Sequence, residues 1–268
     1  QGRASLTETV TVPKGKKPLI LSIDNVCYED DVREAGYIDK LIISGDTIMG
    51  GKILDDGSVI PTDREAMPML EAFIKSHPDF SYKGAKMTLC LSGYAGILGY
   101  RTDPSFSGKY DTEEEKRGAI EVIEWLKNNG YTFACHSYSH GEFTKMTAQS
   151  VRDDIEKWQA YVEPLIGKTD IFCYPYGSAP YYGSENHQLL LDGGFVYFLS
   201  CAVNSYLLDG RHPVADGKYA DDTGTVYACR FTVAGVTLRR YASPVDYNLE
   251  MGLPPEEALT AVPDAGYE

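Results

Sequence analysis

Hydrophobic positions along the chain fall into short runs rich in β-branched and aromatic residues, separated by longer amphipathic segments. The short runs predict strands at 19–24, 40–44, 85–92, 131–135, 170–174, 195–200 and 226–233. The longer segments repeat apolar residues at helical spacing and predict helices at 62–77, 111–130, 147–167 and 183–194. Strands that alternate with helices of this length predict βα units and a mostly parallel sheet.

Two arrangements of such a sheet are compatible with this pattern. Six or seven strands within about 230 residues favour a (β/α) barrel, and an open, doubly wound sheet is the alternative. No glycine-rich phosphate loop follows any of the strands, so nucleotide binding has no support. Segment 45–61 differs from the rest, because Gly50-Gly51 lies between strand-like runs and Asp56-Gly57 marks a turn, which predicts a local β-hairpin insertion.

Composition narrows the class of protein. The 268 residues suit one large domain, and the net charge of −14 argues against binding to nucleic acid or anionic membranes. No apolar run approaches the roughly 20 residues of a membrane span. The chain begins without Met and without the apolar core of a signal peptide, so we expect an extracellular or surface location if a signal was removed and a cytoplasmic one otherwise. The six cysteines form no CxxC pair, and buried free thiols are the simplest interpretation.

Two histidines stand directly after a predicted strand, in the sequence HSYSH at 136–140. Active sites of parallel α/β folds gather where strands end. His136 and His140 are four residues apart and can point the same way on a helical turn, and neutral imidazole is a good zinc ligand. The pair is therefore a candidate metal site.

Two other predicted strands end at residues that could take part in catalysis. Asp24 ends the first predicted strand in SIDN, where a carboxylate could serve a metal hydrolase as ligand or base, or act only as a turn former. The strand at 170–174 leads into Pro175, Tyr176 and Gly177, a turn in which glycine permits a bend that exposes backbone N–H groups.

These motifs, SIDN, HSYSH and FCYPYG in this order, resemble those of the polysaccharide deacetylases, the NodB-homology domain of carbohydrate esterase family four. The resemblance covers roughly residues 18–200 and implies a deformed (β/α) barrel of about seven parallel strands with one divalent metal, most often zinc. It implies a single domain over 1–268, with an N-terminal extension at 1–17 and a C-terminal tail at 245–268. It also implies roles for individual residues: Asp24 as the general base, His136, His140 and Asn25 as metal ligands, the backbone N–H of Tyr176 facing a developing oxyanion, and Tyr174, Pro175 and Tyr138 contacting the substrate.

The sequence departs from that family at three positions. The second aspartate of the motif is Asn25, which is neutral. The arginine that orients the base in the family falls at Cys173. The late histidine that acts as general acid is missing, because the later histidines, His187 and His212, are not in the predicted strand 226–233.

The resemblance therefore predicts a metal-dependent deacetylase with an altered set of motifs. Its substrate would be an acetylated glycan such as peptidoglycan or a chitin-like oligomer, with N-acetyl groups favoured. The alternative is a carbohydrate-binding pseudoenzyme of the same fold that has lost the chemistry.

Overall fold

The structure is a computed structural model that describes residues 11, 13–14, 19–201, 212–213, 219–220 and 224–230. The predicted tail at 245–268 lies outside the described residues, as does most of the predicted extension at 1–17. None of the helices in the described part of the chain is long and apolar enough to cross a membrane.

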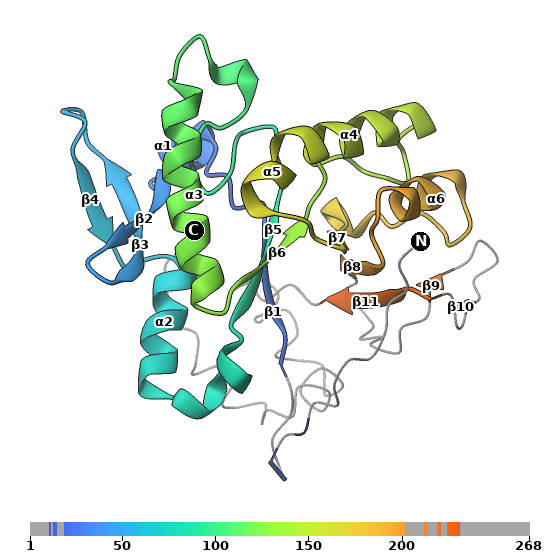
Figure 1. Cartoon of the computed structure of the whole chain (residues 1–268), viewed down its shortest axis with the longest axis horizontal. Helices are drawn as coiled ribbons and strands as arrows, with labels where there is room; N and C mark the ends of the chain where they lie inside the picture. Colours follow the sequence, from blue (N-terminus) through green and yellow to red (C-terminus); the bar gives the residue numbers. More distant parts are fainter. Residues whose placement is uncertain are drawn as a thin grey trace.

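A six-stranded sheet with parallel pairing throughout forms the centre of the molecule (Figure 1). In spatial order its strands are β1 (Leu21–Asp24), β5 (Met87–Leu91), β6 (Thr132–Cys135), β7 (Ile171–Cys173), β8 (Tyr197–Cys201) and β11 (Val226–Arg230). The sheet curls into part of a barrel, which confirms the predicted deformed (β/α) barrel. The described residues also form a small antiparallel pair of β9 (His212–Pro213) and β10 (Tyr219–Ala220).

Helices are present in all four predicted segments, and the short helix at Asp30–Glu34 was not predicted. The helices are α1 (Asp30–Glu34), α2 (Ala66–Ser76), α3 (Thr112–Asn128), α4 (Ala148–Tyr161), α5 (Glu163–Ile166) and α6 (Glu185–Asp192). The predicted helix 147–167 is divided into α4 and α5, since Pro164 at the start of α5 has no N–H for a helical hydrogen bond. Asp111 caps α3 by accepting hydrogen bonds from the N–H groups of Glu113 and Glu114.

The prediction that 40–44 joins the parallel sheet is wrong, and the described residues contain six parallel strands rather than about seven. This segment is β2 (Lys40–Ser44), and it pairs antiparallel with β3 (Thr47–Ile53), which pairs with β4 (Val59–Thr62). The two-residue loop Gly45-Asp46 between β2 and β3 causes this, because so short a connection can only reverse the chain.

The predicted insertion at 45–61 is therefore part of a separate three-stranded sheet, and one of its predicted turns is wrong. Gly50-Gly51 lies within β3, where a Cβ atom on Gly50 would come 2.6 Å from the side chain of Ile38. Asp56-Gly57 does form a turn, with Gly57 at φ 82° and its N–H donating to the carbonyl of Leu54. In Figure 1 this small sheet lies beside α3, away from β11.

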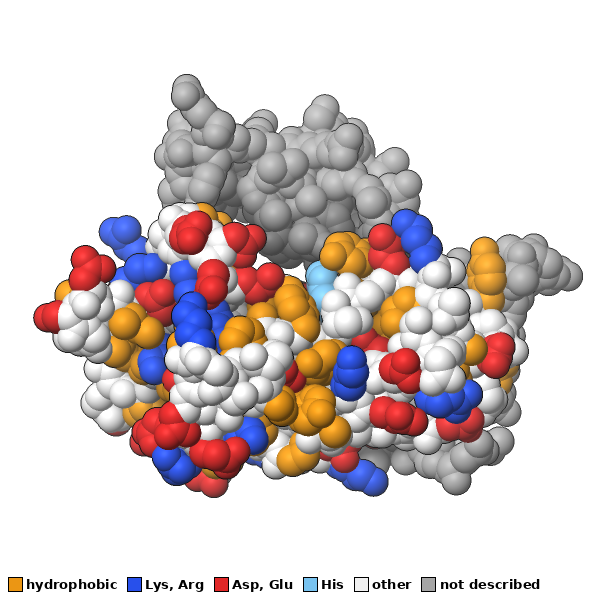
Figure 2. All heavy atoms as spheres, turned by 90° about the horizontal axis from the view of Figure 1, so that it is seen from above, with side chains coloured by type: hydrophobic (Ala, Val, Ile, Leu, Met, Phe, Trp, Pro, Cys, Tyr) orange, Lys and Arg blue, Asp and Glu red, His pale blue; other side chains and the backbone are white. Residues whose placement is uncertain are grey.

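The main core fills the space between the parallel sheet and its helices. Its aromatic members pack edge to face around Phe172, which contacts Phe143, Tyr174 and Phe195 with ring centroids 5.0–5.1 Å apart. On the outer surface seen in Figure 2, acidic and basic side chains are interspersed, with a stretch of hydrophobic side chains between them. The packing of the aromatic core around Phe172 fixes the ends of the strands, where the candidate site lies.

Candidate active site

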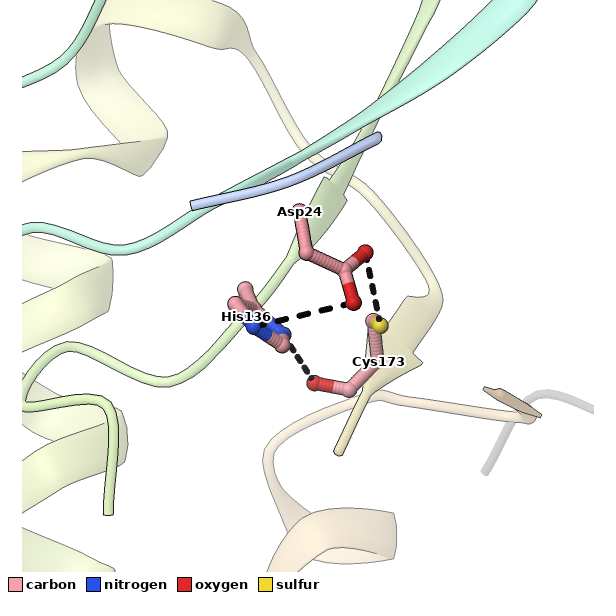
Figure 3. A group of neighbouring side chains, drawn as sticks. All are labelled: Asp24, His136 and Cys173. Atoms are coloured by element: carbon pink, nitrogen blue, oxygen red, sulfur yellow. Dashed lines mark hydrogen bonds and ion pairs between the residues drawn. The ribbon is translucent and has the colours of Figure 1, made fainter. Parts of the chain in front are cut away.

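Three side chains meet at the carboxyl end of the parallel sheet: Asp24 from β1, His136 directly after β6, and Cys173 from β7 (Figure 3). Their potential ligand atoms all lie within 4.8 Å of one another. The Nε2 atom of His136 is 3.9 Å from Oδ2 of Asp24, and the Cys173 thiol donates to Oδ1 of Asp24 at 3.5 Å. The parallel register brings these strand ends together, as their positions in the sequence predict.

His136 is a buried, neutral imidazole. Its Nδ1 atom is 2.8 Å from the carbonyl oxygen of Cys173, so this nitrogen carries the proton and Nε2 keeps its lone pair. Burial lowers the pKa of His136 to about 4, although Asp24 and the Cys173 carbonyl favour the charged form. Since an imidazole must be neutral to bind a metal, His136 is ready for that role at neutral pH.

His140 lies against His136, with ring centroids 4.9 Å apart, and on its other side against Tyr176 at 4.7 Å. Burial also lowers the pKa of His140, opposed by Glu29 and Asp24. His140 has a φ of 56°, in the left-handed region that residues other than glycine seldom adopt. Ser137 in the same loop has a φ of 64°. Such strain persists only where the surroundings impose it, and it often marks functional sites.

A buried carboxylate imposes that loop conformation. Asp154 of α4 is 4% exposed and accepts hydrogen bonds from the Ser137 hydroxyl at 2.9 Å and from the N–H groups of Tyr138 and Ser139 at 2.8 Å each, as well as from the Ser139 hydroxyl. Our sequence analysis missed Asp154. The signal was present, because Asp154 sits beside Val151 and Ile155 on the apolar face of its helix, where a lone acid needs an explanation.

Arg230, which the sequence analysis also missed, holds Asp24 in place. Arg230, at the end of β11, donates from Nη1 to Oδ1 of Asp24 at 2.6 Å and from Nη2 to Oδ2 at 2.8 Å. Burial tends to raise the pKa of Asp24, but the hydrogen bonds and charge of Arg230, with His136, outweigh it, so the pKa lies below its usual value. In the sequence Arg230 lies inside the predicted strand 226–233, and nothing near it indicates that its partner is Asp24.

Asn25 lies in a closed polar cluster beside Asp24, with a φ of 55°. Its Oδ1 accepts from the hydroxyl of Ser92 and from the thiol of Cys27 at 3.4 Å. Its Nδ2 donates to Oε1 of Glu29 at 3.3 Å, and the hydroxyl of Tyr94 donates to the same Glu29 oxygen. The family motif has an aspartate where this chain has Asn25, and the nearest carboxylate in this cluster is that of Glu29, four residues later.

The turn after β7 has the predicted sharp bend. Gly177 has a φ of 67°, and a Cβ atom there would come 2.5 Å from the carbonyl oxygen of Cys201, so only glycine fits. Tyr176 has a φ of 57° and a side chain that is 68% exposed beside His140. Tyr174 and Pro175 are buried, and Tyr174 stacks on Phe198 with ring centroids 5.8 Å apart.

The remaining predicted residues lie as follows. Tyr138 is partly buried, and its hydroxyl donates to Asp103 at 2.7 Å. His187 packs between Tyr182 and Phe198, with ring centroids 4.9 and 5.3 Å away. The side chain of His212 lies outside the described ones. The end of β11 thus carries Arg230 and no histidine.

His136 and His140 are the donors best suited to a divalent metal. The potential ligand atoms of His136, Asp24 and Cys173 lie within 4.8 Å of one another, and the ring of His140 lies against that of His136 with centroids 4.9 Å apart. The lowered pKa values of both histidines favour neutral imidazole, which is a good zinc ligand. Asn25 could add an amide oxygen, although Ser92 and Cys27 already bind it. Asp24 is less suited to ligation, because both of its oxygens bind Arg230. The thiol of Cys173 is also a weak candidate, because burial, with Cys90 and Asp24, raises its pKa well above the usual value.

Comparisons with known proteins agree with this geometry. Residues 105–193 match the polysaccharide deacetylase family profile, and this stretch includes HSYSH and the turn after β7. No curated protein matches the chain.

Several solved structures are similar to the chain, all at low identity. A protein assigned as a polysaccharide deacetylase from Mycobacterium smegmatis has a TM-score of 0.47 and 11% identity, covering 91% of this chain and 77% of its own. The chitin deacetylase of the fungal pathogen Colletotrichum lindemuthianum has a TM-score of 0.36 and 12% identity, covering 75% and 84%.

A third similar structure is the BA3943 protein of Bacillus anthracis, described as a CE4 family pseudoenzyme. It has a TM-score of 0.35 and 15% identity; the similarity covers 69% of this chain and 56% of that protein, little more than half its length. TM-scores below 0.5 give these similarities no weight for function. The family match over residues 105–193, together with the three strand-end motifs, makes this chain similar to the polysaccharide deacetylases.

Proposed function

We propose that this protein is a metal-dependent deacetylase that hydrolyses acetyl groups, N-acetyl by preference, on a carbohydrate polymer. The observation that carries the proposal is the meeting of Asp24 and His136 at the carboxyl end of the sheet, 3.9 Å apart, with His140 beside them. This arrangement supports the proposal of a base next to a metal site.

That geometry supports the following proposed roles for the chain's own residues. His136 and His140, with Asn25 as the expected third ligand, would hold one divalent ion, for which we expect zinc. Such an ion, when bound, polarises an acetyl carbonyl and acidifies water. Asp24 stays ionised because of Arg230, so it can take the proton from the attacking water. The water oxygen adds to the acetyl carbon as Asp24 takes one proton from the water. Asp24 then returns that proton to the amide nitrogen, the carbon–nitrogen bond breaks, and the remaining acid proton passes to the freed amine, which gives acetate and an ammonium group.

Release of acetate tests the proposal directly. The protein should be stripped of metal, reloaded with zinc or cobalt, and incubated with N-acetylated chito-oligosaccharides and peptidoglycan fragments. We expect acetate only from the loaded protein, with Asp24→Asn and His136→Ala at least about 100-fold slower, since a general base contributes on that scale. Asp55→Asn, in the exposed β3–β4 turn, is the matched control and should retain the rate of the unmodified protein.

A second candidate is a carbohydrate-binding pseudoenzyme of the same fold. Two substitutions favour it, the neutral Asn25 and the buried thiol of Cys173, together with the lack of a histidine at the end of β11. It predicts that the loaded protein binds the same oligosaccharides, measured by calorimetry, and releases no acetate from any of them. Any release that Asp24→Asn abolishes would exclude this candidate.

A further inference from the structure

The contact between Arg230 and Asp24 joins the two edges of the parallel sheet. Asp24 lies on β1 and Arg230 on β11, the first and last strands in the spatial order. A flat sheet would hold these strands about 24 Å apart, at about 4.8 Å per neighbouring pair. The curl of the sheet and the length of the arginine side chain together close that gap to a hydrogen bond of 2.6 Å.

Small side chains provide the space that Arg230 crosses. Asp24 pairs with Cys90 across the sheet, and Cys90 pairs with Ala134, so these three residues face the same side. Cys90 and Ala134 form one buried cluster with Cys173. Nη1 of Arg230 lies 4.0 Å from the sulfur of Cys90. A longer side chain at Cys90 would meet the guanidinium group.

The register also places Arg230, on the other edge strand, on the face of the sheet that carries Asp24 and Cys90. Cys173 pairs with Leu199, and Leu199 with Ala228, two residues before Arg230. Arg230 is 17% exposed, against 33% for Asp24, so the pair is partly shielded from water. It also donates to the hydroxyl of Ser22 on β1 at 2.9 Å, which fixes the guanidinium group from a second direction.

The two parallel hydrogen bonds determine the orientation of the carboxylate. A bidentate arginine pair defines the plane of the carboxylate as well as its position. Oδ2, bound by Nη2 at 2.8 Å, is the same oxygen that faces Nε2 of His136 at 3.9 Å. If Arg230 were absent, this oxygen could turn toward His136 and join any ion held there.

We infer that Arg230 is the positioning residue for Asp24: it aims the carboxylate as a base and holds it out of the coordination sphere of the metal. The part of this inference that concerns the base rests on the proposed deacetylase function. The part that concerns coordination does not, because it can be measured on a protein that hydrolyses nothing. The small thiol of Cys173 belongs to the same arrangement, since it leaves Arg230 room to reach Asp24.

The test compares Arg230→Gln, Arg230→Lys and the double variant D24N/R230Q with the unmodified full chain. Arg152→Gln, an exposed position on α4, is the matched control for loss of an arginine. Circular dichroism verifies folding of each variant. The double variant removes both partners, so it carries no unpaired buried charge if Arg230→Gln alone proves unstable.

Two measurements distinguish a role of Arg230 in positioning Asp24 from a purely structural role in joining the two edges of the sheet. In the kinetic readout, Arg230→Gln should lower kcat about 100-fold with KM little changed, the loss expected from a misplaced group, and Arg230→Lys should recover part of it. In the binding readout, Arg230→Gln should bind zinc about tenfold more tightly, with an altered cobalt spectrum, and D24N/R230Q should lose this gain.

The outcomes are distinguishable from failure of the proposed function. If the unmodified protein releases no acetate, the proposed function fails, and the zinc affinities alone decide on Arg230. Tighter zinc binding that depends on Asp24 supports the inference. A folded Arg230→Gln variant with the zinc affinity and cobalt spectrum of the unmodified protein overturns it, as would an undiminished kcat in an active protein.

Discussion

The two loops that form the candidate site are held in opposite ways. The histidine loop, 136–140, is held by a carboxylate, Asp154, from the next helix along the chain, 15–17 residues away from the groups it binds. The loop after β1, residues 24–29, is pinned by cations from distant elements. Arg101 binds its Tyr28 carbonyl across 73 residues of sequence, and Arg230 binds Asp24 across 206.

This difference separates the histidine loop, for which we propose metal binding, from Asp24, for which we propose proton transfer. The histidine loop belongs to a single βα unit, so it can form as soon as β6 and α4 pack together. The position of Asp24, in contrast, depends on contact between the two edge strands of the sheet. We therefore expect changes near the histidines to act on metal binding and changes near Asp24 to act on catalysis, and the variants below test that division.

The largest effect is expected from Arg101, which is 2% exposed and donates to the carbonyl oxygens of Cys27, Ala95 and Tyr28. Arg101→Met keeps the packing and leaves these acceptors unsatisfied, which should cost about 4 kcal/mol of unfolding free energy. Urea unfolding measures it. Arg117→Met, at an exposed arginine on α3, should leave stability nearly unchanged. A loss at Arg101 no greater than at Arg117 would show that the loop after β1 does not need its cation.

Asp154→Asn is the corresponding change in the histidine loop. Its amide keeps one acceptor oxygen but turns two donor hydrogens toward groups that also donate, so we expect a loss of about 3 kcal/mol. Zinc affinity should fall about 10–100-fold, the range for residues that orient metal ligands. The exposed neighbour Asp153 gives the control, Asp153→Asn, which should change neither quantity. Unchanged zinc binding in a folded Asp154→Asn variant would contradict the role given to this carboxylate.

The same contrast explains what the sequence could predict. The histidine pair, Asp24 and the glycine turn were all found from strand ends, because each is a local pattern of a parallel sheet. The strand at 40–44 was assigned to the wrong sheet, since its composition is that of a buried strand and only the short Gly45-Asp46 loop shows its direction. Arg230 was missed because its partner is 206 residues away, and no local pattern encodes that pairing.

A smaller effect is expected from pH. Because burial lowers the pKa of His136 to about 4, from 6.5, the folded metal-free protein binds a proton there less readily than the unfolded chain. The stabilisation from neutral His136 is complete above pH 6.5 and is lost as the pH falls toward 4. Between pH 7.5 and 5 this amounts to about 2 kcal/mol.

His136→Gln checks this expectation, because glutamine cannot be protonated in that range. Urea unfolding of the metal-free variant should lose about 2 kcal/mol less than the unmodified protein between pH 7.5 and 5. His77→Gln, at an exposed position at the end of α2, provides the control and should follow the unmodified protein. Parallel pH curves for His136→Gln and the unmodified protein would contradict the buried, neutral state of this imidazole.

The smallest effect concerns where the negative charge beside Asp24 resides. Asn25→Asp alone would place a second carboxylate 3.3 Å from the Glu29 oxygen that the Asn25 amide now contacts, so we expect about 1 kcal/mol of destabilisation. The exchange N25D/E29Q keeps the total charge and restores an amide–carboxylate pair in reverse, so the stability of the unmodified protein should return.

The N25D/E29Q exchange also brings the negative charge four residues closer in sequence to Asp24. Calorimetry should then show tighter zinc binding for N25D/E29Q than for the unmodified protein, since an anionic oxygen binds zinc better than a neutral one. Equal affinities would mean that Glu29 already supplies this charge to the histidine pair, in which case Glu29→Gln alone should weaken zinc binding.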